Sequence, residues 1–441
     1  MKKLWPCCSV VILALSMSLS PTANAQAATL STDTQPSTAS SPSKITGYTL
    51  SPERYKKAHS LTQASFHLDL FSFFYGLVVF LFILRLKLAP KYRTWAERAS
   101  SNRLLQALIF APSLILTIDL LQLPLGMYGH WLSHSYGLST RGWPSWFLDW
   151  SKAELVSALV ATLFVWILYS VLRKSPARWW LYFWLASLPI MLALTFVEPL
   201  VYEPLFYKFE SLASKSSALT QELQRLVQHA GVSIPPERMF WMGASEKTNA
   251  LNAYVTGFGA SKRVVIWDTT IAKMNTPQIV SVVGHEMGHY VLLHIPKGLA
   301  LSAVGLLVLF YLGFRCIGWV LAHWGRSWDI RGPDDWASLP ALLLLLSVFA
   351  SLATPVTSAV SRYFEHQADQ YGLEVTHGLT PDSGQVTAQA FQVLGDLDLD
   401  DPNPDSLDVF LFYSHPPIRD RVQFCLTYDP WSKGRQGEFV K

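Results

Sequence analysis

The segment His285–His289, with the sequence HEMGH, is the part of the chain best suited to chemistry. Residues four apart lie on one face of a helix, so the two imidazoles can hold one Zn²⁺ ion, with Glu286 beside an attacking water. Thr276 and Pro277 predict the helix start, because a capping hydroxyl is followed by proline in the first turn. The alternative, a histidine pair packed in a protein interior, is the less favoured interpretation.

A catalytic zinc ion usually has three protein ligands and one open position. We predict Glu365 as the third ligand, and we predict that Asp369, one turn later on the same face, accepts a hydrogen bond from a ligand histidine. His366 points about 100° away from Glu365, and His294 is nine residues after His285, on the opposite face of that helix. We expect neither to bind the metal. Without the HEMGH segment, a solvated helix face would be the favoured interpretation of the Glu365/Asp369 pair.

Two further segments resemble parts of a substrate site. Residues 251–259 and 264–268 are β-rich runs around a glycine-containing turn and predict a hairpin. An exposed strand edge at Asn252, Ala253 and Tyr254 could pair with an extended peptide, although a plain structural hairpin fits the sequence equally well.

His415 precedes two prolines that fix a turn before a helix. Its imidazole could donate a hydrogen bond to a developing oxyanion and so take part in catalysis. Taken alone, a surface turn is the safer interpretation of this segment.

The composition indicates the scaffold that must position these groups. Of the 441 residues, 50% are apolar and 15% are charged, whereas a soluble protein carries about 25% charge. The net charge of +4 gives no support for nucleic-acid binding. Six apolar runs approach the roughly 20 residues that a bilayer requires. They lie near 68–88, 104–124, 154–173, 179–201, 297–321 and 337–358.

These runs divide the chain into segments. Residues 1–25 have the pattern of a secretory signal peptide, with a first membrane helix as the alternative. The predicted segments are the signal 1–25, a Ser/Thr/Pro-rich linker and short surface helix at 26–67, four spans in 68–202, a zinc peptidase domain at 203–296, two spans in 297–360, and a C-terminal part at 361–441 that completes the site.

Loop charges predict the orientation. Lys and Arg cluster after the first span, between residues 87 and 103, and after the third span, between residues 173 and 178. The positive-inside rule places both loops in the cytoplasm. We therefore predict a bacterial inner-membrane protein whose zinc site faces the periplasm.

Together these motifs resemble the type I CAAX prenyl protease family and its relatives among bacterial membrane heat-shock proteases. The matching segments, in chain order, are 135–138, 203–209, 252–254, 262–269, 285–289, Ser361-Arg362 with Glu365 and Asp369, and 415–417 with Arg421. The resemblance implies that His285, His289 and Glu365 bind zinc and that Glu286 is the catalytic acid/base. It also implies that the 252–254 edge, His415 and Arg421 face the substrate.

The expected fold is mainly α: a polytopic membrane helix bundle or ring with an inserted α+β, gluzincin-like metalloprotease domain that carries a small hairpin or sheet. The expected activity is zinc-dependent endopeptidase activity with one Zn²⁺ per chain, acting on a peptide or protein at the lipid bilayer. We expect turnover of membrane or exported polypeptides, with processing of prenylated CAAX proteins as the alternative. A zinc-binding scaffold and a transporter are the non-enzyme alternatives, and the sequence leaves the oligomeric state open.

Overall fold

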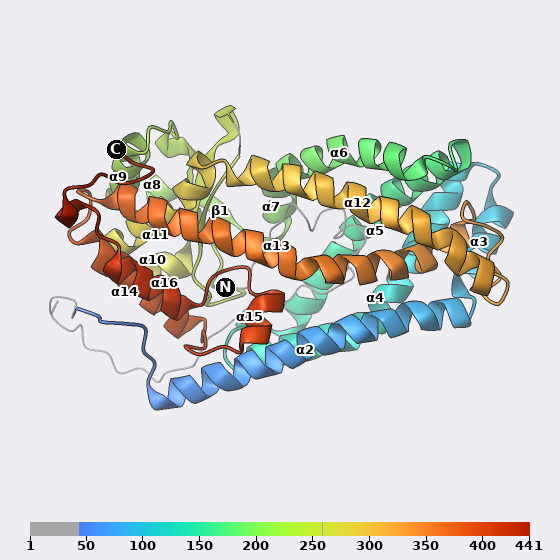
Figure 1. Ribbon diagram of the computed structural model, residues 1–441, viewed down its shortest axis with the longest axis horizontal. Coiled ribbons are helices and arrows are strands. Elements are labelled where there is room, and N and C mark those ends of the chain that lie inside the picture. The colour runs from blue at the N-terminus through green and yellow to red at the C-terminus, as the bar shows by residue number, and fades with distance from the viewer. Residues whose placement is uncertain (1–43, 258) are drawn as a thin grey trace.

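A computed structural model describes residues 44–257 and 259–441 (Figure 1). The predicted signal at 1–25 and most of the linker lie outside the described residues. Six helices are long and apolar enough to cross a membrane, as the sequence predicted. They are α2 (Pro52–Arg85), α4 (Arg103–Ser135), α5 (Trp143–Lys174), α6 (Trp179–Val197), α12 (His294–Trp324) and α13 (Leu339–Thr376).

The six long helices contact one another in the closed order α2, α4, α5, α6, α12, α13 and back to α2, which confirms the predicted ring. One end of the ring is tightly packed: Ile83, Phe110 and Trp336 belong to one buried apolar cluster there. The short helix α3 (Leu88–Ala99) lies at this end, opposite the elements of the predicted peptidase domain (Figure 1).

Helix α2 differs from the prediction. The sequence predicted a separate short surface helix before the first span, whereas α2 runs from Pro52 to Arg85 without interruption. The Ser51 side chain caps its first turn by accepting from the Arg54 amide. Proline occurs only at the helix start, where it is tolerated, so nothing separates the polar first turns from the span.

The peptidase elements lie beyond the other end of the ring (Figure 1). A four-stranded sheet has the order β1-β2-β4-β3, in which β2 and β4 are parallel and the other pairs are antiparallel. The β3–β4 pair confirms the predicted hairpin. The elements are α7 (Glu203–Phe206), β1 (Phe209–Ser211), α8 (Leu212–Lys215), α9 (Ser217–His229), β2 (Met239–Met242), β3 (Ala253–Thr256), β4 (Arg263–Trp267), α10 (Asp268–Lys273), α11 (Thr276–Val291), α14 (Ser383–Leu397), α15 (Ser406–Phe412) and α16 (Ile418–Thr427).

Helix α11 carries the HEMGH segment and begins one residue earlier than its predicted cap implies. Asn275, not Thr276, is the N-cap: its side chain accepts from the Gln278 amide, and the Gln278 side chain accepts from the Asn275 amide. This reciprocal capping box satisfies two amides that would otherwise lack partners. Pro277 lies in the first turn, as predicted.

Helices α11 and α13 approach each other at backbone distance. A Cβ added at Gly372 of α13 would lie 2.9 Å from the amide nitrogen of His285, and one at Gly288 of α11 would lie 3.0 Å from Cα of Ala368. Only glycine allows two helices to pack so closely. The approach brings the histidines of α11 next to the carboxylates of α13.

We predict that Gly372→Ala lowers the free energy of unfolding by about 1–3 kcal/mol, because the new methyl group forces the two helices apart. Metal affinity should fall as well, since the ligands of the two helices separate. The control is Gly318→Ala in α12, where an added Cβ meets nothing within 4 Å. Thermal unfolding and metal titration of both variants test this, and equal behaviour of the two would contradict it.

Candidate metal centre

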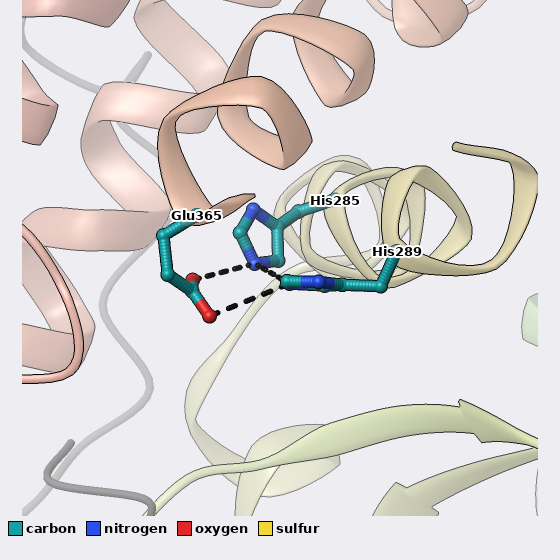
Figure 2. A group of neighbouring side chains, drawn as sticks. All are labelled: His285, His289 and Glu365. Carbon is teal, nitrogen blue, oxygen red and sulfur yellow. Dashed lines mark hydrogen bonds and ion pairs between the residues drawn. The ribbon is translucent and has the colours of Figure 1, made fainter. Parts of the chain in front are cut away.

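Three side chains from α11 and α13 converge on one point (Figure 2). Nε2 of His285 lies 3.2 Å from Nε2 of His289 and 3.3 Å from Oε2 of Glu365. Nε2 of His289 lies 3.5 Å from Oε1 of Glu365. The structure therefore brings the three predicted metal ligands together, although 75 residues lie between His289 and Glu365 in the chain.

These spacings fit a metal ion of zinc size. Zinc–ligand bonds of about 2.0–2.2 Å place two ligands of a tetrahedral ion about 3.3–3.6 Å apart. The three measured distances lie in or next to that range. Glu365 is 4% exposed and His285 is 7% exposed, so few water molecules compete for these atoms.

Asp369 contacts the ring nitrogen of His285 that faces away from the converging atoms. Its Oδ1 lies 2.8 Å from Nδ1 of His285, which leaves Nε2 of that ring for a cation. Arg421 donates to both carboxylate oxygens of Asp369, at 2.9 Å from Nε and 2.6 Å from a terminal nitrogen. Arg421 is 4% exposed and its guanidinium faces Asp369, and the substrate-facing position that the resemblance implied stays a prediction.

The electrostatics of the site favour a bound cation. Burial alone would lower the pKa of His285, but its hydrogen bonds to Asp369 and Glu365 outweigh burial and raise the pKa to about 10. In a neutral His285 ring that donates from Nδ1 to Asp369, the lone pair on Nε2 would face the negatively charged carboxylate of Glu365. A positive charge, either a proton or a metal ion, is therefore needed between them.

His415 lies on the other side of Glu365. Its Nε2 is 3.2 Å from Oε1 of Glu365, and its Nδ1 is 2.9 Å from the Ser414 hydroxyl. Burial lowers the pKa of His415 to about 3, although the Glu365 carboxylate acts in the opposite direction, so the ring is neutral near pH 7. A neutral ring with one N–H directed at the centre is suited to donate a hydrogen bond.

Arg362 fixes the segment that leads to His415. From α13 it donates to the backbone carbonyls of Val409 and Tyr413, at 2.9 and 2.7 Å. These carbonyls lie at the end of α15, directly before the turn. Arg362 belongs to the Ser361-Arg362 segment of the resemblance, which gave it no role. Its contacts depend on the fold, so the sequence alone did not reveal them.

The two rival ligands lie apart from the converging atoms. The His366 ring packs against Phe424, with centroids 4.5 Å apart, as its helical position predicted. The prediction that His294 lies on the opposite face of the same helix as His285 is wrong. Helix α11 ends at Val291, and His294 begins α12. Its Nδ1 lies 3.1 Å from Nδ1 of His289, behind that ring.

Strand β3 is the edge strand of the described sheet and contacts α11. The carbonyl of Asn252 accepts from the Trp267 amide at 3.0 Å, and Tyr254 is paired with Val265 of β4. Since backbone groups alternate along an antiparallel strand, those of Ala253 and Val255 face the open edge. The Tyr254 hydroxyl instead donates to Glu203 at 2.8 Å. The buried side-chain nitrogen of Asn252 has no acceptor among the described residues.

Known proteins are similar to this chain over most of its length. The sequence model of peptidase family M48 matches residues 213–428, and that of the CAAX prenyl protease N-terminal region, described as five membrane helices, matches residues 34–208. The uncharacterized metalloprotease YhfN of Bacillus subtilis is 36% identical over 87% of this chain and 89% of its own.

More distant relatives cover similar lengths. A CAAX prenyl protease 1 homolog of Arabidopsis thaliana is 25% identical over 85% of this chain and 88% of its own. The crystal structure of S. mikatae Ste24p is similar in fold, with a TM-score of 0.73, 23% identity, and coverage of 86% of this chain and 89% of that one.

We predict that Arg421→Met lowers the free energy of unfolding by about 3–5 kcal/mol, because it leaves the buried carboxylate of Asp369 without its cation. Arg419→Met is the matched control: Arg419 lies on the same helix but is exposed, so its loss should change stability by no more than about 0.5 kcal/mol. Unfolding of the two purified variants in detergent measures the difference. Similar losses in both would show that the Asp369–Arg421 pair does not stabilise the site.

Proposed function

The chain belongs to peptidase family M48 and is a membrane metallopeptidase, and from this premise we propose that His285, His289 and Glu365 hold its catalytic metal as one Zn²⁺ ion per chain. The observation that carries the proposal is the convergence of two imidazole nitrogens and one carboxylate at 3.2–3.5 Å. A zinc ion held there would supply Lewis acidity, which polarises a peptide carbonyl and makes water a stronger acid.

The protein's own side chains carry the proton and orient the substrate. Glu286 follows ligand His285 directly and is half-buried. It accepts a proton from the attacking water and delivers it to the leaving amine. His415 donates its N–H to the oxygen on which negative charge develops. Asp369, fixed by Arg421, keeps His285 in the tautomer that leaves Nε2 free.

An extended peptide fits the open edge of β3. The backbone groups of Ala253 and Val255 face the open edge and would bond the peptide. The backbone groups of Asn252 and Tyr254 face β4 instead. The unpartnered amide of Asn252 remains available for a substrate carbonyl. A buried donor without an acceptor is costly, and a bound peptide would remove that cost.

The substrate class that we propose is membrane or exported polypeptides. Relatives named CAAX prenyl protease favour prenylated proteins as a second candidate. Offering a farnesylated CAAX peptide and a misfolded membrane protein to the same preparation separates the two candidates.

We propose that the peptidase elements lie outside the cytoplasm, on the outer side of a bacterial inner membrane. The ring end that carries α3 has the basic residues Lys87, Lys91, Arg93, Arg98, Arg173, Lys174, Arg178, Arg326 and Arg331 in or beside its short loops. The short α4–α5 connection at the other end has one basic residue, Arg141. Residues before α2 also lie at this second end, since the backbone amides of Ile45 and Thr49 donate to side chains of α14.

We predict that Glu286→Gln retains metal but loses at least about 100-fold in peptide hydrolysis, because the proton acceptor is gone. Glu222→Gln, an exposed change in α9, is the control and should keep full activity. Metal content by mass spectrometry and cleavage of a fluorogenic peptide test both variants. Normal turnover by Glu286→Gln would remove Glu286 from the mechanism.

For the orientation, we expect an impermeant maleimide to label Ser217→Cys in intact cells and Ser101→Cys only after permeabilisation. The two serines are exposed at opposite ends of the ring, in α9 and before α4. The native cysteines are first replaced by alanine. The reverse labelling pattern would place the metal centre in the cytoplasm.

A further inference from the structure

A third histidine lies directly behind the metal ligand His289. His294 is 0% exposed, and its ring stacks on Phe364 with centroids 4.4 Å apart and planes 11° apart. Its Nδ1 is 3.1 Å from Nδ1 of His289, and its Nε2 is 3.2 Å from Oε1 of Gln367. Both ring nitrogens of His294 therefore have partners, one on α11 and one on α13.

The contacts of Gln367 set the direction of this chain of hydrogen bonds. The Gln367 side-chain oxygen faces Nε2 of His294, and its amide nitrogen faces the Tyr363 hydroxyl, each at 3.2 Å. An amide oxygen only accepts, so Nε2 of His294 carries a hydrogen, and Nδ1 of a neutral ring then has the lone pair. His289 must therefore donate from Nδ1, which leaves its Nε2 free to face the metal centre.

A strained turn puts His294 in this position. Leu293 has a φ of 59°, which is unfavourable for a residue with a Cβ. Its side chain is 57% exposed, so burial of the leucine does not offset this cost. In an uninterrupted helix, His294 would lie about 140° around the axis from His289. The turn instead brings the first residue of α12 back against the His289 ring.

We infer that His294 is a positioning residue, which fixes the tautomer and direction of the metal ligand His289 through the chain that starts at Gln367. The inference rests on the proposed role of His289 as a ligand. Metal-binding histidines usually donate their second N–H to a carboxylate, a backbone carbonyl or water. In this protein a neutral imidazole takes that place for His289, whereas His285 uses Asp369.

The decisive variant is His294→Phe, which keeps an aromatic ring on Phe364 and removes both ring nitrogens. We expect metal affinity, measured by competition with a chelator, to fall about 10–100-fold. The visible spectrum of the Co²⁺-loaded protein should change because His289 is no longer held in one orientation. His366→Phe is the matched control: it makes the same chemical change on α13, at a ring that packs against Phe424.

A second pair of variants does not alter the histidine. Gln367→Leu removes the acceptor for Nε2 of His294 and should weaken metal binding. Gln367→Glu keeps an acceptor oxygen and should retain the metal affinity of the unmodified protein. This pair decides the matter if His294→Phe fails to fold. Equal metal affinity in Gln367→Leu and Gln367→Glu would overturn the inference in that case.

The remaining outcomes separate this inference from the proposed function. Unchanged affinity and an unchanged Co²⁺ spectrum in His294→Phe, together with lost binding in His289→Ala, would overturn the positioning role and leave the metal site intact. Unchanged binding in His289→Ala would overturn the proposed site itself.

Discussion

The contact between α11 and α13 is the constraint on which the metal centre depends. Glycines at 284, 288 and 372 allow the two backbones to touch, and any Cβ at Gly372 would collide with the backbone of His285. The ligands extend from both sides of this contact, so their spacing is set by the positions of two rigid helices. A site built on helices holds its geometry more precisely than a site built on loops.

The two histidines that we propose as ligands differ in the groups that contact their Nδ1 atoms. His285 contacts the carboxylate of Asp369, whose charge is balanced by Arg421, while His289 contacts the neutral ring of His294. A carboxylate behind each histidine would add a further buried negative charge beside Glu365. A neutral acceptor avoids the desolvation penalty of that charge while still fixing the ring.

The sequence predicted what depends on local spacing. The i, i+4 pairs His285/His289 and Glu365/Asp369, the six spans and the β3–β4 hairpin follow from helical and strand periodicity. The features that the sequence did not predict have non-local or conformational causes. The periodicity of α11 gives no sign of the left-handed turn at Leu293, so His294 was placed on the wrong face. The buried position of Arg421 depends on α16 packing against α13 and α14, which no local pattern reveals.

Helix α13 connects the membrane ring with the chemistry. Its successive turns hold the α15 backbone through Ser358 and Arg362, provide Glu365 and Asp369, and hold His294 through Gln367. The same helix contacts α2 and α12 inside the ring, and Pro355, where a helix bends most readily, lies before all of these residues. From Ser358 to Thr376 the helix has no further proline, so this stretch lacks the commonest cause of a kink. A shift of the ring that moves α13 must therefore move a metal ligand, its supporting carboxylate and the anchor of His415 together.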